Sequence, residues 1–294
     1  MRSPAHAVRP RTGHISFLNC FPLIRALERS GALAHMEISP GTPGRIADLL
    51  VRGEIDLGPV SLVEYLRHAG DLLLLPGMAI GCDGPVLSCT LVSSVPLSEL
   101  GGRRVELGST SRTTVELARL LIEERTVGRP LYRTAEPDLP AMLDRSEAAV
   151  VIGDTGLRSH FHGGRLADHF VYDLGDLWKK RTGHPMVFAV WAVRRDFAEQ
   201  HEDAVHRAHS SLLAARSLAD DDLAGAAGRA AEVSPFSRDE LETYFRCLRF
   251  DLTDEMREGM RVFAEAMAER GVVEGPPVPR VFPVGGGTGR NRSW

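Results

Sequence analysis

The sequence predicts an α/β protein that folds as two lobes with a ligand cleft between them. Residues 14–92 alternate short apolar strands with amphipathic helices over short links, which is typical of a mostly parallel sheet. A second alternating run follows the break at 93–96, and the apolar segment 187–193 predicts a strand that returns the chain to the first lobe. At 294 residues, 43% of them hydrophobic, the chain is long enough to bury a full core.

Short strands and polar helix caps alternate along the first run. The strands are expected at residues 14–18, 36–39, 54–58, 72–75 and 85–92. Three helices begin at residues that suit a cap, namely Asn19, Thr42 and Ser61. Thr42 is followed by Pro43 in a favoured first-turn position, and Ser61 with Glu64 fits a capping box. Ligands of such sheets bind where the strands end, so these caps mark one edge of the expected cleft.

The second run and the C-terminal part complete the expected organisation. Further strands are predicted at 104–107, 130–132, 148–154 and 170–174, and helices at 115–122, 139–143, 197–229 and 238–269. We expect a flexible tail over 1–12, a first lobe over 13–95 and 191–284, a second lobe over 96–190, and a flexible glycine-rich tail over 285–294. Two crossings between the lobes, near 93–96 and 190–194, predict hinge closure around one small ligand.

One stretch between a strand and a helix carries the clearest sign of a binding site. It holds five hydroxyl side chains and one arginine. A helix start has unpaired N–H groups and the positive end of the macrodipole, so it suits an anion. The chain has no Gly-x-Gly-x-x-Gly and no lysine after a glycine loop, so a carboxylate fits better than a nucleotide phosphate. The candidate ligands are Ser109, Thr110, Ser111, Arg112, Thr113 and Thr114.

Composition and charge exclude several classes of partner. The net charge of −4, with both signs mixed, argues against a nucleic-acid surface. No apolar stretch reaches membrane length, and no apolar run follows the N-terminal arginines to form a signal peptide. Four scattered cysteines without a Cys-x-x-Cys fit a reducing compartment, and His160 and His162 lack a third metal ligand nearby. We expect a soluble cytoplasmic protein without metal, nucleic-acid or membrane partners, and the oligomeric state stays open.

Five stretches carry a family resemblance. They are Ile15–Leu23, Gly53–Ser61, Gly108–Thr114, Ile152–Asp154 and Trp178–Trp191. In these stretches, and in the order of elements over roughly 13–280, the sequence resembles chorismate dehydratase, the first enzyme of the futalosine route to menaquinone. The resemblance implies a type II periplasmic-binding-protein fold. His184 departs from it, because an apolar residue is expected at that position.

The resemblance implies an activity and a set of site residues. It implies loss of water from chorismate to give 3-[(1-carboxyvinyl)oxy]benzoate, with no metal or organic cofactor. Chorismate carries two carboxylates, which suits a cleft of hydroxyls and helix N-termini. Asn19 and Ser88 are implied as the catalytic residues. Thr42, Ser61 and Asp154, at the ends of strands, are expected to contact the substrate.

The residues themselves leave alternatives open. Asn19, Thr42, Ser61 and Asp154 suit ordinary capping, and Thr113 with Glu116 fits a capping box. No general base is evident and no Gly-x-Ser-x-Gly turn supports a hydrolase, so an elimination in which a substrate carboxylate takes the proton is one hypothesis. The competing interpretations are a non-catalytic anion-binding protein or sensor, and an enzyme for another anionic menaquinone intermediate.

Overall fold

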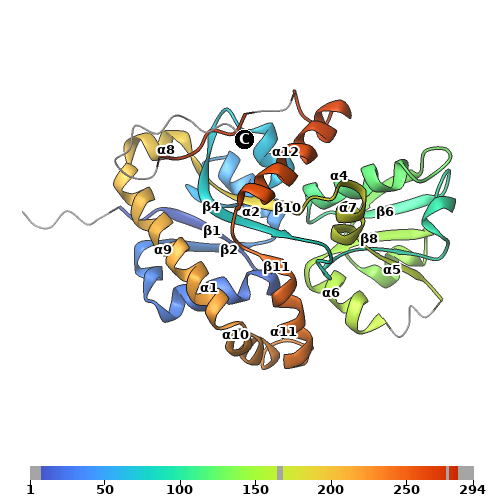
Figure 1. The fold of residues 1–294 in the computed structure, drawn as a ribbon, viewed down its shortest axis with the longest axis horizontal. Coiled ribbons are helices and arrows are strands. Elements are labelled where there is room, and N and C mark those ends of the chain that lie inside the picture. The colour runs from blue at the N-terminus through green and yellow to red at the C-terminus, as the bar shows by residue number, and fades with distance from the viewer. Residues whose placement is uncertain (1–7, 164–167, 276–277, 284–294) are drawn as a thin grey trace, which may run out of the picture.

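Two lobes, each built on one β-sheet with helices around it, make up the structure, a computed structural model that describes residues 8–163, 168–275 and 278–283 (Figure 1). The predicted two-lobed α/β fold is confirmed. The first sheet has six strands in the spatial order β11 (Leu248–Arg249), β4 (Leu72–Cys82), β10 (Met186–Arg194), β3 (Leu57–Ser61), β1 (Arg11–Ile15) and β2 (Glu37–Gly41). The second has five, in the order β7 (Leu131–Ala135), β6 (Arg104–Gly108), β8 (Ala148–Ile152), β5 (Cys89–Ser93) and β9 (Phe170–Asp173).

The helices divide between the lobes by their place in the chain. Those of the first lobe are α1 (Phe21–Arg29), α2 (Pro43–Val51), α3 (Leu62–Arg67), α8 (Arg195–Gln200), α9 (Glu202–Asp221), α10 (Leu223–Ala231), α11 (Arg238–Cys247) and α12 (Asp254–Glu269). Those of the second lobe are α4 (Arg112–Glu123), α5 (Leu139–Leu143), α6 (Gly153–Phe161) and α7 (Leu174–Thr182). Short 3-10 turns are η1 (Leu18–Cys20), η2 (Ala32–His35) and η3 (Leu97–Glu99).

The strand pairing follows from the alternation of strands and helices. β1 pairs in parallel with β2 and β3, and β6 pairs in parallel with β7 and β8. The returning strand β10 runs antiparallel to β3 and β4, while β5 runs antiparallel to β8 and β9. Because the helices follow the carboxyl ends of the parallel strands, several helix starts meet at one edge of each sheet.

The lobe boundaries differ from those expected. β5 belongs to the second sheet, so residues 89–95 lie in the second lobe, and β10 enters the first sheet at Met186 rather than 191. Buried strands such as these are apolar on both faces, and their sequence does not indicate which sheet they join. Residues 11–12, expected in a tail, form the start of β1. Residues 1–7 of the first expected tail and the whole of the second, 285–294, lie outside the described residues.

Two of the predicted caps are wrong, one is confirmed, and Ser61 occupies the N-cap position without the predicted bond. Asn19 lies within η1, and Cys20 occupies the N-cap of α1 without a side-chain bond. Ser61 makes no cap bond to α3. Thr42 does cap α2, because its hydroxyl accepts from the N–H of Arg45. α4 begins at Arg112, one residue after its N-cap, so the box predicted from Thr113 and Glu116 does not form.

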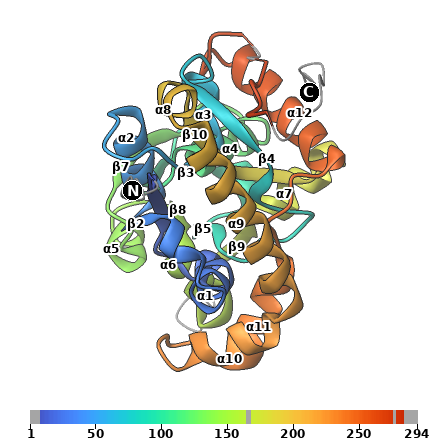
Figure 2. The same ribbon diagram turned by 90° about the vertical axis from the view of Figure 1, so that its left-hand side faces the viewer.

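Apolar faces of the long helices cover the first sheet. Leu23 and Leu27 of α1 are buried with Leu212 of α9 against Trp191 of β10, in a cluster that lies on one side of this sheet. Figure 2 shows α9 running across the molecule on that side, next to α1. In the described part of the chain, no helix combines the length and apolar character needed to cross a membrane.

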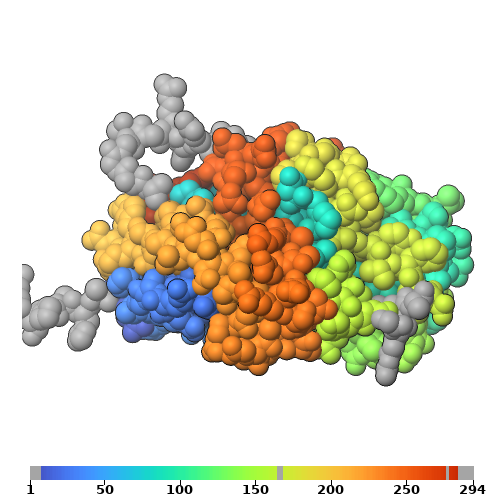
Figure 3. Space-filling view, turned by 60° about the horizontal axis from the view of Figure 1, so that its bottom comes forward, coloured from blue at the N-terminus to red at the C-terminus, as the bar shows by residue number. Residues whose placement is uncertain are grey.

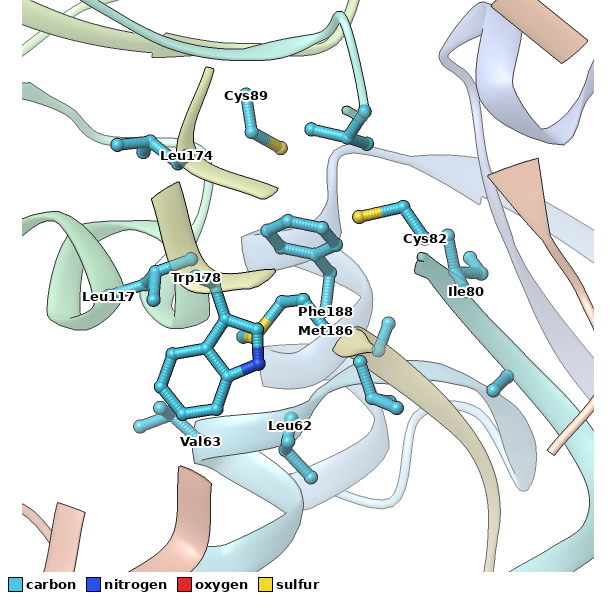
Figure 4. Close-up of a cluster of buried hydrophobic side chains, with 14 of the residues drawn as sticks. Leu62, Val63, Ile80, Cys82, Cys89, Leu117, Leu174, Trp178, Met186 and Phe188 are labelled. Atoms are coloured by element: carbon cyan, nitrogen blue, oxygen red, sulfur yellow. The ribbon is translucent and has the colours of Figure 1, made fainter. Parts of the chain in front are cut away.

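The largest apolar cluster continues from one lobe into the other. Figure 4 shows part of it, where Leu117 of α4 and Trp178 of α7 lie near Val63 of α3 and Met186 of β10. Leu117, Trp178, Val63 and Met186 are all fully buried. The two lobes therefore share one core at the place where the chain crosses between them.

Trp178 is the best test of this shared core. Trp178→Ala is expected to lower the free energy of unfolding by about 3–5 kcal/mol, because it empties a large buried volume. It also removes the N–H that donates to the Pro185 carbonyl at 3.1 Å. Val127→Ala is the control, since that side chain is 96% exposed. Urea unfolding followed by circular dichroism measures both variants, and equal midpoints would contradict a core shared between the lobes.

Candidate functional site

A buried cavity of about 50 Å³ lies between the lobes. Its lining includes the last residues of three strands, Ile15 of β1, Ser61 of β3 and Ile152 of β8. Asn19 and Ser88 also line it. This volume holds one or two water molecules, given that each water occupies about 30 Å³ in the liquid. A larger ligand must therefore enter a more open arrangement of the lobes.

Helix N-termini from both lobes converge on this cavity. Pro43 and Gly153, the first residues of α2 and α6, line it, as does Ser111, the N-cap of α4. Ser61 precedes α3, and Asn19 lies two residues before α1. Each helix start brings partial positive charge, so together they favour an anion.

The cavity lining contains no charged side chain. Among the described residues that line it, none is Asp, Glu, His, Lys or Arg. Cys89 is the one cysteine among them, and burial raises the pKa of its thiol to about 12. Its sulfur accepts from the Thr114 hydroxyl at 3.7 Å. The polar part of the lining is therefore made of hydroxyl, amide and thiol groups that stay neutral near pH 7.

Two polar atoms of the lining lack a partner among the described residues. They are the side-chain oxygen Oδ1 of Asn19 and the hydroxyl Oγ of Ser61, both buried. A buried polar group without a hydrogen bond costs about 1–3 kcal/mol. A hydrogen-bond donor on a bound ligand would satisfy the Asn19 oxygen, and a donor or an acceptor would satisfy the Ser61 hydroxyl.

Ser88 has a partner that the sequence did not reveal. Its Oγ accepts from the phenol of Tyr244 on α11, at 2.9 Å. Tyr244 is 1% exposed. A buried aromatic residue at helical spacing is ordinarily part of a core, so no sequence signal distinguished Tyr244.

Arg112 and Thr113 join the lobes instead of lining the cavity. The Arg112 guanidinium pairs with Asp48 of α2 at 2.7 Å and with Glu64 of α3 at 3.1 Å. The Thr113 hydroxyl is buried and accepts from the Val63 N–H, at the start of α3, at 3.1 Å. Arg112 already has two carboxylate partners, so it is not placed as the anion ligand that the sequence predicted.

The other candidates divide between the cavity and its surroundings. Ser111 and Thr114 line it, and their hydroxyls lie 3.1 Å apart. The Thr110 carbonyl accepts from the Gly44 N–H of α2 at 3.2 Å, another bond between the lobes. Ser109 is exposed and donates to Glu136. Neither Ser109 nor Thr110 lines the cavity, and Thr42 acts only as the cap of α2.

Asp154 also forms a bond between the lobes. Its carboxylate accepts from the Leu18 N–H at 3.0 Å, and burial raises the pKa of Asp154. Its neighbour Gly153 adopts a φ of 61°, which favours glycine, and a Cβ there would lie 2.7 Å from the Phe17 ring. Asp154 thus holds the lobes together beside the cavity, outside its lining.

His184 and His162 do not line the cavity. The backbone N–H of His184 donates to Thr182 between α7 and β10, and the ring of His162 contacts Glu240. Across the residues that the structure describes, no group of three or more His, Cys, Asp or Glu side chains is placed to hold a metal ion.

Comparison with known proteins assigns the family. A family model described as menaquinone biosynthesis matches residues 10–269, so the chain belongs to that family. The chain is 31% identical over 265 residues to chorismate dehydratase of Thermus thermophilus, covering 85% of this chain and 92% of that protein.

Solved structures share the fold at low identity. A protein from Archaeoglobus fulgidus matches with a TM-score of 0.73 at 16% identity, over 92% of this chain and 100% of its own. The alkanesulfonate-binding protein of Xanthomonas axonopodis pv. citri, solved with MOPS, matches with a TM-score of 0.68 at 15% identity, over 92% and 96%. These likenesses confirm the periplasmic-binding-protein-like fold.

Thr113 allows a test of the contact between the lobes. Thr113→Val is expected to lower the free energy of unfolding by about 1–3 kcal/mol, because the buried Val63 N–H loses its acceptor. Thr134→Val, at an exposed position of β7, is the control and should change it by less than about 0.5 kcal/mol. Urea unfolding gives both values. The assigned bond would be refuted by a Thr113→Val midpoint equal to that of the unsubstituted protein.

Proposed function

We propose that this protein is a chorismate dehydratase, a hydro-lyase that removes water from chorismate to give 3-[(1-carboxyvinyl)oxy]benzoate. The main observation in support of this function is the cavity between the lobes. Among the residues that the structure describes, helix N-termini converge on it, two of its buried polar atoms lack a partner, and no charged side chain lines it. Such a cavity favours an anion whose charges are met by helix ends and hydroxyls. Chorismate carries two carboxylates, and the 31% identical relative is a chorismate dehydratase.

Asn19 and Ser88 are proposed to orient the substrate rather than to exchange protons with it. Elimination breaks the ring C–O bond of the hydroxyl and one ring C–H bond, and it leaves an aromatic ring. Neither an amide nor an unassisted Ser hydroxyl is a useful base at neutral pH. We therefore assign the base to a carboxylate of the substrate.

The neutral lining supports a substrate that supplies its own base. A carboxylate next to an arginine has its pKa lowered by about 1–3, which makes it a weaker proton acceptor. Arg112 is turned toward Asp48 and Glu64 and does not line the cavity, so no arginine charge there lowers the basicity of a bound carboxylate. Exclusion of water by the closed lobes strengthens the remaining electrostatic interactions.

The first test of this proposal is turnover. Purified protein without added metal is expected to convert chorismate to the enolpyruvyl benzoate. The product is followed by its ultraviolet spectrum and identified by mass spectrometry. Tight binding of chorismate in isothermal titration calorimetry, with no product after long incubation, would instead support a non-catalytic binding protein.

The pH profile tests the source of the base. Because Asn19 and Ser88 do not titrate and the Cys89 thiol stays protonated, kcat is expected to be constant between roughly pH 6 and 8. It should fall only under acidic conditions, below about pH 4, where the bound carboxylate takes up a proton. A bell-shaped profile that loses one limb in His184→Ala would overturn the substrate-assisted step while leaving the dehydratase activity in place.

A further inference from the structure

Tyr244 and Ser88 form a buried pair that joins two distant parts of the chain. Tyr244 comes from α11, next to β11 of the first sheet, whereas Ser88 precedes β5 of the second sheet. The phenol oxygen and Ser88 Oγ lie 2.9 Å apart, and both residues are buried. Ser88 lines the cavity and Tyr244 does not. Tyr244 therefore reaches the site through Ser88.

The chemistry of the two hydroxyls sets the direction of this bond. A phenol is a stronger acid than an aliphatic alcohol, and its oxygen is a weaker acceptor because the ring draws on its lone pair. The phenol therefore donates and Ser88 Oγ accepts. Burial also raises the pKa of Tyr244, which keeps its proton in place. The proton of Ser88 is then directed away from Tyr244.

The backbone around Ser88 is fixed by its surroundings. Leu87 has a φ of 63°, the one positive φ among the non-glycine residues that the structure describes. Such a conformation persists when neighbouring contacts hold it. The Asp173 carboxylate accepts from the N–H groups of Val86 at 3.0 Å and Leu87 at 2.7 Å. Gly156 of α6 packs so closely on Ser88 that a Cβ would collide with the Ser88 backbone.

Rotation of its hydroxyl is the main freedom left to Ser88. We propose that Tyr244 is a positioning residue that removes this freedom and makes Ser88 a one-way hydrogen-bond donor to the substrate. The inference rests on the proposed function, in which the acceptor is an oxygen of chorismate such as that of the leaving hydroxyl. Ser88 then stabilises charge that develops on this oxygen as the C–O bond breaks.

The pair also depends on contact between the lobes. His162, the residue after α6, contacts the start of α11. Its side chain lies 3.1 Å from that of Glu240, and its ring stacks on that of Phe236, two residues before α11. Figure 3 shows the orange surface of the α10–α11 region lying against the yellow-green surface of the second lobe. Ser88 is therefore hydrogen-bonded to Tyr244 when the start of α11 contacts the end of α6. The Ser88 hydroxyl is oriented in this closed arrangement of the lobes.

The test compares Tyr244→Phe, Ser88→Ala and the double variant. Tyr244→Phe keeps the ring and its packing, and it is expected to lower kcat by about three- to tenfold, the effect of one hydrogen bond, while KM changes less than about twofold. In the Ser88→Ala background the same substitution should have no further effect on kcat. Tyr65→Phe is the matched control, because Tyr65 is equally buried and does not line the cavity.

Several results would overturn the inference. One is a kcat for Tyr244→Phe equal to that of the unsubstituted protein. Another is a decrease in kcat on Tyr244→Phe that has the same size in the Ser88 and Ser88→Ala backgrounds, because this indicates a general structural role of Tyr244. Turnover by the unsubstituted protein is measured first, so failure of the proposed function is seen separately. If the unsubstituted protein shows no turnover, the dissociation constant for chorismate is measured for the same three variants instead of kcat. The inference is rejected if chorismate does not bind, or if Tyr244→Phe changes its affinity equally with and without Ser88.

Discussion

Hydrogen bonds from helix-start N–H groups of the first lobe to acceptors of the second lobe hold the site together. The N–H of Leu18 donates to Asp154, that of Gly44 to the Thr110 carbonyl, and that of Val63 to Thr113. A helix start leaves several N–H groups without partners inside the helix. At each of these three helix starts, the second lobe accepts a hydrogen bond from one such N–H group. The cavity lies where these helix starts meet.

This arrangement separates charge from the cavity. The ion pairs between elements of the two lobes, such as Arg112 with Asp48 and Glu64 or Lys179 with Asp83, lie outside the lining. Inside, the protein offers neutral hydroxyls and the partial charges of helix ends. Such groups hold an anion without neutralising it through a salt bridge, which suits a reaction in which the anion itself is the base.

The two kinds of contact between the lobes have different mechanical roles. The polar bonds around the cavity can exchange with water when the lobes separate, at a small net free energy for each bond. The apolar cluster around Trp178 and Met186 cannot open without exposing large side chains. It lies where the chain crosses between the sheets, so it fixes the lobes to each other at that place.

The sequence by itself determined the α/β class, the order of strands and helices, and the position of the polar residues at the strand ends. These follow from local patterns, because apolar periodicity and turn residues act over a few neighbours. The same patterns singled out Asn19 and Ser61, whereas Ser88 was implied by the family resemblance, and the structure places all three on the cavity lining.

Only the tertiary structure decided which of these polar residues face the cavity and which join the lobes. Arg112 lies one residue from Ser111, yet its charge is taken up by Asp48 and Glu64, which are distant in sequence. The sheet to which β5 belongs was decided in the same way, because a strand buried on both faces carries no sign of its partner. Tyr244 lies 156 residues from Ser88, and no local rule connects a tyrosine on a C-terminal helix with a serine before a strand.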